Sequence, residues 1–245
     1  DVYKRQNLIY QLKLIKLLPN LLTILNGLCG CLAIVFIFMD VDFLNLNGYE
    51  LALILVLLGS LFDFFDGYLA KILDAKTKIG VQLDSFSDLI TFSVTPSLLL
   101  FHFFQSQSEE IEFFAFISFL IVPFSMIRLA RFNTLPSKTY FLGLPSPANG
   151  IFFMGIPFLT FEVPIYLFSI IIFLSCILLI SNIKFESFKS IETNIKKVFF
   201  LFFILIMVGV ITFIYVNNYS YLNLVSISVV VYVISSLAFN LYKAF

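Results

Sequence analysis

Eight apolar runs, most of them close to the length of a membrane-spanning helix, dominate this chain. An α-helix needs about 20 mainly apolar residues to cross the hydrocarbon core of a bilayer. Charged and turn-forming residues separate runs at 17–39, 50–73, 84–104, 113–133, 147–161, 164–182, 197–216 and 221–241. Because 60% of the residues are hydrophobic and 12% are charged, a water-soluble fold would lack polar surface. The sequence therefore predicts an all-α integral membrane protein, a polytopic bundle of about eight transmembrane helices.

The charges between these runs are sorted by sign. Every Lys and Arg falls on one side of the predicted membrane: Lys4, Arg5, Lys13, Lys16, Lys71, Lys76, Lys78, Arg128, Arg131, Lys138, Lys184, Lys189, Lys196, Lys197 and Lys243. The other side receives Asp40, Asp42, Glu50, Glu109, Glu110, Glu112 and Glu162. Basic loops stay in the cytoplasm. We therefore expect a multi-pass protein of the cell (inner) membrane with both termini cytoplasmic and an even number of spans.

No internal repeat and no Pro- or Gly-rich linker divides the chain. We expect a cytoplasmic or interfacial segment at 1–16 and one transmembrane domain at 17–245, with a core at 17–182 and two additional spans within 197–241. The approach LIYQLKLIKLLPN is amphipathic and can lie along the membrane interface, or it is a frayed cytoplasmic end. The first six residues, DVYKRQ, lack an initiator Met and a signal-peptide cleavage pattern, so they support no expectation. The chain has no basic face that would suit nucleic acid.

The stretch DFFDGYLAKILDAKTKIGVQLDSFSD, residues 63–88, places four aspartates beside the predicted cytoplasmic surface. Asp63 and Asp66 share one face of a helix, as do Asp84 and Asp88. A predicted loop of about ten residues makes the two helices antiparallel neighbours, so the pairs can converge. Four carboxylates brought together repel one another unless cations neutralise them. Oxygen ligands suit Mg²⁺ or Mn²⁺, and four aspartates can hold two ions.

Small residues and a lysine accompany the acids. Gly67 and Ala70 remove side-chain bulk where a ligand or another helix approaches closely, and Gly80 lies in the predicted loop. Lys71 at the helix end can reach a phosphate as a point charge. The alternative is that the acids are membrane-edge residues paired with nearby lysines, and Asp74 fits that description. For the four aspartates of the two pairs, a functional role is favoured because ionisable groups within a membrane span are costly.

Written as D-x2-D-G-x2-A-K-x8-G-x3-D-x3-D, the stretch resembles the signature of the CDP-alcohol phosphotransferases, which have Arg where this chain has Lys71. Within that family, other segments resemble the bacterial phosphatidylserine synthases: LPNLLTILNGLCG at 18–30, DSFSDLITFSVTPSLLL from Asp84, IRLARFNT from Ile127 and FLGLPSPANG from Phe141. The resemblance covers about residues 18–150, and the last spans match only in hydropathy. It implies the CDP-alcohol phosphotransferase fold and a catalytic role for the transmembrane domain.

The reaction that this resemblance implies joins a lipid to an alcohol. The hydroxyl of L-serine attacks the phosphorus that bears the diacylglycerol of CDP-diacylglycerol, CMP leaves and phosphatidylserine forms. Other members of the family use glycerol 3-phosphate or inositol phosphate as the acceptor, and we do not expect the FLGLPSPA stretch in them. A cation transporter is an alternative of a different class, but it predicts acids near the bilayer midplane and inverted repeats, which this sequence lacks. The resemblance also implies a homodimer.

The same resemblance assigns roles residue by residue. The implied metal ligands, for two Mg²⁺ or Mn²⁺ ions, are Asp63, Asp66, Asp84 and Asp88, with Asp88 also the base for the serine hydroxyl. The implied contacts to CDP-diacylglycerol are Asn20, Thr23, Gly67, Lys71, Thr77 and Gly80. Arg128 and Arg131 bind the serine carboxylate or a lipid phosphate, or they anchor the topology as positive charges. In GLPSPANG, Pro145 and Pro147 shape a serine-sized pocket or an ordinary turn.

Overall fold

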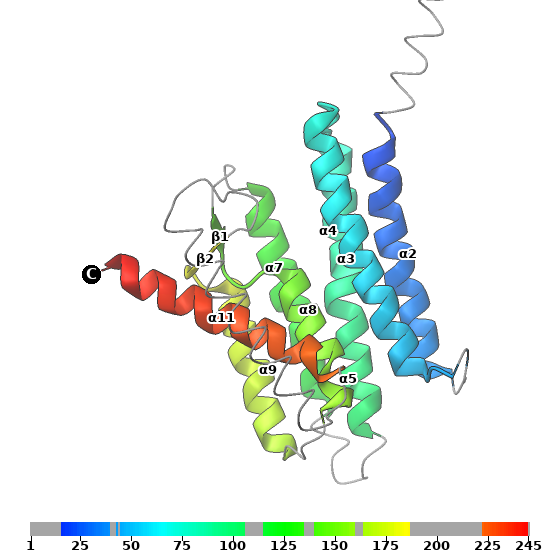
Figure 1. Cartoon of the computed structure of the whole chain (residues 1–245), viewed down its shortest axis with the longest axis vertical. Coiled ribbons are helices and arrows are strands. Elements are labelled where there is room, and N and C mark those ends of the chain that lie inside the picture. Colours follow the sequence, from blue (N-terminus) through cyan, green and yellow to red (C-terminus); the bar gives the residue numbers. More distant parts are fainter. Residues whose placement is uncertain are drawn as a thin grey trace, which may run out of the picture. The chain divides into compact units, whose positions relative to one another are not determined.

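The computed structural model describes residues 16–39, 43, 45–105, 115–134, 140–159, 164–186 and 222–244. Within these ranges the chain is helical apart from one short pair of strands and the turns. The chain packs as two compact units, Asp1–Thr91 and Phe92–Phe245 (Figure 1). The predicted run 197–216 and most of the predicted interfacial approach lie outside the described residues.

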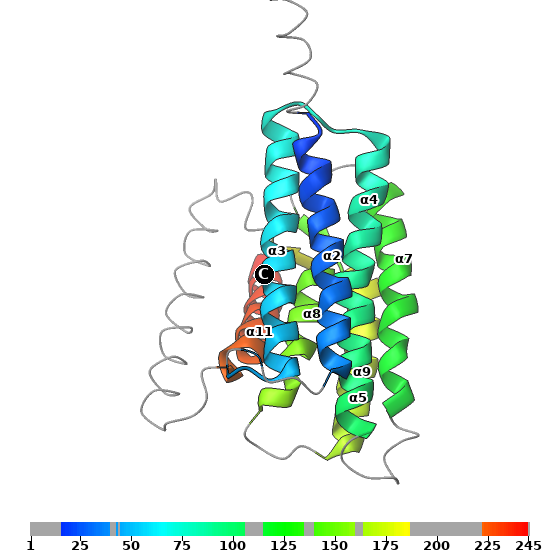
Figure 2. The ribbon, with the colours of Figure 1, turned by 90° about the vertical axis from the view of Figure 1, so that its right-hand side faces the viewer.

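Three helices form the described part of the first unit: α2 (Leu18–Phe38), α3 (Gly48–Ile72) and α4 (Lys78–Leu89). Helix α2 packs along both α3 and α4, and Figure 2 shows the three running side by side. Thr23 near the start of α2 contacts Asp66 near the end of α3, so α3 runs antiparallel to α2. Asn20 lies against Gly80 and Asn26 bonds to Asp88 further along both helices, so α4 runs parallel to α2. The predicted runs 17–39 and 50–73 are therefore confirmed as helices almost to the residue.

Side-chain caps set the starts of α3 and α4. At α3, the Asn47 side chain accepts a hydrogen bond from the Glu50 backbone N–H at 3.0 Å, and the Glu50 carboxylate accepts one from the Asn47 N–H at 2.8 Å. This reciprocal pair is a capping box. At α4, Thr77 Oγ1 accepts from the Gly80 N–H at 2.9 Å, so Thr77 satisfies a backbone donor that the first helical turn leaves unpaired.

The cap at Thr77 corrects two expectations about the connection between α3 and α4. The helix begins at Lys78 rather than at residue 84, so Gly80 lies in the first helical turn and not in a loop. The connection is residues 73–77, about half the predicted length. Hydropathy placed the start too late because the first turns of α4 are polar, whereas capping depends on the geometry of a single threonine.

Two glycines allow the helices of the first unit to approach closely. A Cβ atom at Gly30 of α2 would lie 2.6 Å from Thr91 Oγ1 and 2.8 Å from Thr91 Cα. A Cβ atom at Gly59 of α3 would lie 2.9 Å from Asn26 Oδ1. At Gly30 the added Cβ would collide with the backbone of Thr91, so this position requires glycine. At Gly59 the Asn26 side chain would have to shift, and the close approach of α3 brings Asn26 between its neighbours.

The helix that starts at Lys78 continues without a break to Gln105. A π-helical turn, η1 (Ile90–Val94), separates α4 from α5 (Thr95–Gln105). The predicted run 84–104 is therefore confirmed as helix and extended at its start. Single π-turns occur often beside functional sites, and this one begins two residues after Asp88.

The second unit contains the remaining helices. Its elements after α5 are η3 (Phe116–Leu120), α7 (Ile121–Thr134), α8 (Ser146–Met154), η4 (Ile156–Phe158), α9 (Ile165–Ile180) and α11 (Asn223–Ala244). They correspond to the predicted runs 113–133, 147–161, 164–182 and 221–241. The run 147–161 is divided, because the α-helix ends at Met154 and a 3₁₀ turn that contains Pro157 follows. Helix α11 packs against α8 (Figure 1).

A short strand pair sets the start of α8. Strand β1 (Tyr140–Leu142) pairs antiparallel with β2 (Lys184–Glu186). After β1 the chain turns at Gly143, whose φ of +78° favours glycine, and the Gly143 N–H donates to the Ile183 carbonyl at 2.9 Å. The residues around this turn belong to a small buried apolar cluster of Leu144, Leu179, Phe185 and Tyr232.

Four helices in the described part of the chain are long and apolar enough to cross a membrane: Leu18–Phe38, Gly48–Ile72, Lys78–Gln105 and Phe116–Thr134. Two shorter apolar helices are Tyr166–Ile180 and Leu224–Ala238. Large apolar side chains on the outer faces, such as Leu21 and Leu28 of α2, are about half exposed, as lipid-facing residues are. The all-α membrane fold is confirmed, while the count of eight spans and the single-domain organisation stay predictions.

Candidate active site

Three of the four predicted acids meet at one end of the first unit. Asp63 and Asp66 lie on α3 and Asp84 lies on α4, and each offers a carboxylate oxygen such that the three oxygens lie within 4.8 Å of one another. Asp66 is buried and the other two are half-buried. The three acids converge because Asp63 and Asp66 are three residues apart on one face of α3, and because α4, which carries Asp84, is the antiparallel neighbour of α3.

The cluster lies near the basic ends of its helices. Asp66 is six residues from the last residue of α3, and Asp84 is six residues from the first residue of α4. At a rise of 1.5 Å per residue, each is about 9 Å from its helix end. Lys71, Lys76 and Lys78 surround these ends and are exposed. The acids therefore lie beside a positively charged rim, away from the middle of a hydrocarbon core about 30 Å thick.

Asp88 occupies a separate position, deeper along α4. It is buried and is not part of the group of three, and its Oδ1 accepts a hydrogen bond from Asn26 Nδ2 at 3.3 Å. Asn26 is fully buried, and the Thr91 hydroxyl donates to its backbone carbonyl at 2.9 Å. The structure thus brings together Asp63, Asp66 and Asp84 and gives Asp88 an amide partner of its own.

Sequence reasoning missed Asn26, although a signal was present. Thr23, Asn26, Gly27 and Gly30 follow one another at helical spacing within an otherwise apolar run, so they mark one polar and small face of α2. That face contacts both other helices of the first unit, because Thr23 meets α3 and Gly27 lies against Ser87 of α4. An amide in the middle of such a face indicates a specific polar partner.

Thr23 contacts an acid of the cluster directly. Its hydroxyl lies within hydrogen-bond distance of the Asp66 carboxylate and of the Pro19 carbonyl. Since a hydroxyl has one proton, these two acceptors share it. Thr23 is buried and holds the orientation of Asp66.

The other residues expected to contact CDP-diacylglycerol lie around the same end of the first unit. The Asn20 side chain faces the first turn of α4, where a Cβ atom at Gly80 would lie 2.8 Å from Asn20 Oδ1. Thr77 caps that turn. Gly67 and Lys71 are exposed on the last turns of α3. The fold therefore gathers these five residues near the acid cluster, while their contacts to a substrate stay predictions.

The donor set fits a hard divalent cation. Carboxylate oxygens are the ligands that Mg²⁺ and Mn²⁺ prefer. With metal–oxygen bonds of about 2.1 Å, two opposite ligands of one ion are about 4.2 Å apart. Oxygens within 4.8 Å of one another therefore need only a small side-chain movement to share an ion. Asp63, Asp66 and Asp84 can hold a divalent metal.

The two arginines predicted to bind an anion make contacts within the second unit. Arg128 is buried, and its Nη1 donates to Ser146 Oγ, the first residue of α8, at 2.7 Å. Arg131 donates to the Ile180 carbonyl at the end of α9, and also to Asn182 Oδ1 at 2.8 Å. These bonds tie the end of α7 to α8 and α9, a structural role that the sequence did not indicate. Their binding of serine or phosphate stays a prediction.

Helices of membrane-spanning length and a cluster of three carboxylates at the basic end of α3 and α4 define a polytopic membrane protein with a group of acids that can hold a divalent cation. The sequence profile described as CDP-alcohol phosphatidyltransferase matches residues 16–234. The chain belongs to the CDP-alcohol phosphatidyltransferase family. The resemblance seen in the sequence is confirmed.

Curated relatives carry one common name, CDP-diacylglycerol–serine O-phosphatidyltransferase. The protein of that name from Bacillus subtilis is 34% identical over 173 residues, which are 70% of this chain and 91% of the relative. The Methanocaldococcus jannaschii protein is 32% identical over 182 residues, 74% of this chain and 79% of the relative. A Helicobacter pylori protein is 30% identical over 190 residues, 74% of this chain and 76% of the relative.

Proposed function

We propose that this chain transfers the phosphatidyl group of CDP-diacylglycerol to the hydroxyl of L-serine, giving phosphatidylserine and CMP. The observation that carries the proposal is the convergence of Asp63, Asp66 and Asp84 on two helices that bear the family signature. The names of the relatives support serine as the acceptor. Glycerol 3-phosphate and inositol phosphate are the alternative acceptors, and the FLGLPSPA stretch favours serine over them.

The transfer exchanges one phosphorus–oxygen bond for another. The serine Oγ forms a bond to the phosphorus that carries the diacylglycerol, and the bond from that phosphorus to the bridging oxygen of CMP breaks. The serine hydroxyl proton goes to a base, for which we propose the Asp88 carboxylate. The hydrogen bond from Asn26 fixes the direction in which that carboxylate points, as a general base requires.

Divalent ions complete the site in this proposal. Asp63, Asp66 and Asp84 would hold them, with Asp88 as a further ligand, and two Mg²⁺ or Mn²⁺ ions suit four carboxylates. When bound, such ions neutralise the charge of the diphosphate and of the departing CMP. Thr23 keeps Asp66 oriented for this role.

The substrate contacts follow the positions of the polar and small residues around the cluster. We propose that Lys71 binds a phosphate of CDP-diacylglycerol, because it is exposed one turn beyond Gly67 on α3. The remaining proposed contacts to the CDP moiety are Asn20, Thr23, Gly67, Thr77 and Gly80. Arg128 and Arg131 are the proposed binders of the serine carboxylate or a lipid phosphate, since guanidinium groups match both geometries.

We also propose that the acid cluster faces the cytoplasm in the inner membrane. Lys16, Lys71, Lys76 and Lys78 flank the helix ends that carry the acids, and the positive-inside rule places such ends in the cytoplasm. A homodimer is proposed on the family resemblance alone. Chemical cross-linking in native membranes tests the dimer, and a membrane-impermeant amine reagent tests the orientation, because these lysines should react only after the cells are opened.

The experiment that tests the function offers three acceptors in parallel. Purified protein in mixed micelles receives CDP-diacylglycerol with Mg²⁺ or Mn²⁺, together with serine, glycerol 3-phosphate or inositol phosphate. We expect CMP release and a new lipid only with serine, and none after chelation of the metal. If another acceptor gives the lipid product and serine does not, the family stands and the proposed acceptor is wrong.

A further inference from the structure

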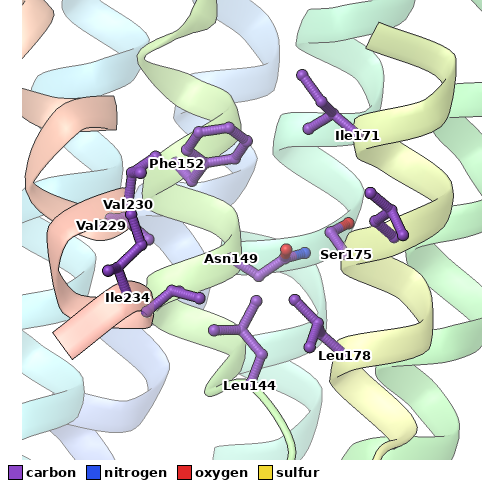
Figure 3. Close-up of a pocket in the computed structure, with 11 residues that line it drawn as sticks. Leu144, Asn149, Phe152, Ile171, Ser175, Leu178, Val229, Val230 and Ile234 are labelled. Carbon is purple, nitrogen blue, oxygen red and sulfur yellow. The ribbon is translucent and has the colours of Figure 1, made fainter. Parts of the chain in front are cut away.

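The positively charged rim of the first unit consists of four exposed lysines. They lie where α2 begins, α3 ends and α4 begins: Lys16, Lys71, Lys76 and Lys78. Asp74 is the one exposed acid among the described residues beside them. In the second unit, by contrast, the pocket between α8, α9 and α11 has no charged residue in its described lining (Figure 3). Only Lys71 of the rim has a place in the proposed reaction, so the other three lysines need another explanation.

The connection between α3 and α4 holds part of the rim in a fixed position. Helix α3 ends at a left-handed residue, Asp74, with a φ of 47°, and the Ala75 N–H donates to the Ala70 carbonyl at 3.0 Å. This bond is that of a Schellman motif, which terminates a helix. Ala75 is buried, and Thr77 caps the start of α4. The exposed Lys76 is therefore held between two anchored points of the backbone.

Two isoleucines project beside these lysines. Ile72, the last residue of α3, is 58% exposed, and Ile79, in the first turn of α4, is 71% exposed. Ile79 is the most exposed large apolar side chain in the described part of the chain. Exposure of such groups to water is unfavourable. Apolar side chains next to lysines are typical of segments that lie in a membrane interface.

The length of α3 places the rim at the depth of the lipid head groups. Helix α3 has 25 residues, so it is about 38 Å long at 1.5 Å per residue, or about 35 Å across the membrane at a common tilt of about 20°. The hydrocarbon core is about 30 Å thick, and the head groups extend the bilayer to about 40–45 Å. The last turn of α3 therefore reaches the head groups. Lysine stems can pack against the apolar boundary there while their ammonium groups reach the phosphates.

The partner that fits both features of the rim is an anionic phospholipid. A soluble anion would use the charge of the lysines and leave the isoleucines in water, whereas a zwitterionic lipid would cover the isoleucines with less gain from the charge. We propose that Lys16, Lys76 and Lys78 bind the head groups of anionic phospholipids, with Ile72 and Ile79 against their acyl chains. This lipid-binding surface is independent of the proposed reaction.

A single introduced tryptophan tests which lipids lie at the rim. The chain contains no tryptophan, so Ile79→Trp supplies the only one, and bromine atoms on lipid acyl chains quench its fluorescence on contact. The full-length variant is reconstituted in phosphatidylcholine bilayers with increasing fractions of brominated phosphatidylglycerol or brominated phosphatidylcholine. We expect phosphatidylglycerol to bind about fivefold more strongly at this position, the effect of one lysine beside an anionic lipid.

Matched variants separate charge from apolar contact. In the Ile79→Trp protein, Lys76→Gln together with Lys78→Gln should reduce the preference for phosphatidylglycerol to less than about twofold, whereas Lys76→Arg with Lys78→Arg should keep it. Phe38→Trp is the positional control, because Phe38 is half-exposed at the opposite end of α2. The described residues from 35 to 50 include no lysine or arginine. The two brominated lipids should therefore quench Phe38→Trp equally.

Three outcomes would overturn the proposal. Efficient but equal quenching of Ile79→Trp by both lipids would mean that the rim contacts the bilayer without selecting anions. An absence of quenching would mean that water or a protein partner, such as a second copy of this chain, covers the rim. A preference that survives Lys76→Gln with Lys78→Gln would exclude these lysines as its cause. If size-exclusion profiles show that Ile79→Trp is misfolded, Ile72→Trp is a second reporter at the same rim, and the same outcomes decide.

Discussion

Asn26 donates a hydrogen bond from its Nδ2 to Oδ1 of Asp88 at 3.3 Å, across 62 positions of sequence. The proposed base on α4 is therefore held by α2, a helix that carries no acid. Two further contacts hold Asn26 itself. The Thr91 hydroxyl bonds to its carbonyl, and Gly59 leaves the space that its Oδ1 occupies.

Replacement of Asn26 by Leu should slow turnover. The change removes the donor to Asp88, and a hydrogen bond to a charged group contributes about 1.5–3 kcal/mol, so kcat should fall by about 10- to 100-fold. CMP release at saturating serine and CDP-diacylglycerol measures the effect. The KM values should change little if Asn26 orients the base only. An unchanged kcat beside a lower melting temperature would assign Asn26 to packing alone.

Asp63→Asn and Asp74→Asn form a matched pair of substitutions. Asp63 belongs to the cluster of three carboxylates, so its loss should weaken metal binding and lower kcat by about 100-fold or more, because loss of a residue that only supports a metal ligand already costs about 10- to 100-fold. Asp74 is exposed with a φ of 47°, a conformation that Asn also adopts. The kcat of Asp74→Asn should therefore stay within about twofold of that of the unchanged protein, because surface substitutions usually have small effects.

Titration with Mn²⁺, followed by electron paramagnetic resonance and by CMP release, measures both variants. Saturating metal should raise the melting temperature of the unchanged protein and of Asp74→Asn, because binding to the folded state alone stabilises it. The melting temperature of Asp63→Asn should rise less when metal is added. Equal metal affinity in the two variants would contradict a metal-binding role for the cluster.

Gly59→Ala should destabilise the first unit. The added Cβ would lie 2.9 Å from Asn26 Oδ1 and 3.0 Å from Thr91 Cγ2, so α3 or Asn26 must move. Overpacking of this kind costs about 1–3 kcal/mol. Ser60→Ala is the control, because the Ser60 hydroxyl bonds only to the Leu57 carbonyl of its own helix among the bonds seen here. Thermal unfolding in detergent compares the two variants. Equal melting temperatures would contradict the prediction and show that the helices accommodate the added methyl group without loss of stability.

Lys71 tests whether the charge or the planar shape of the residue matters. Lys71→Gln should raise the KM for CDP-diacylglycerol by about tenfold, the effect of one lost charge-assisted contact. Lys71→Arg should lower KM or leave it unchanged, because Arg is the residue of the family signature and pairs bidentately with phosphate. Lys76→Gln, at another exposed lysine of the same rim, is the control. If Lys71→Gln and Lys76→Gln raise the KM for CDP-diacylglycerol equally, Lys71 has only a general electrostatic role.

Much of the fold follows from local patterns. The limits of α2 and α3 differ from the predicted runs by at most two residues, because apolar length and flanking charge determine where a helix crosses a bilayer. The pairing of Asp63 with Asp66 on one helix face also follows from spacing alone. The start of α4 does not, because it depends on the Thr77 cap.

The sequence by itself determined the membrane class and the family, and it predicted a meeting of four acids of which Asp63, Asp66 and Asp84 form one group. Each of these depends on composition, periodicity or a motif of fixed spacing. Only the tertiary structure separated Asp88 from the other three acids and gave it Asn26 as a partner. It alone joined Arg131 to Ile180 and buried the Asn149 side chain of α8. These contacts depend on the rotation and depth of one helix against another. Close packing at glycines such as Gly59 sets both, and spacing along a single helix does not encode them.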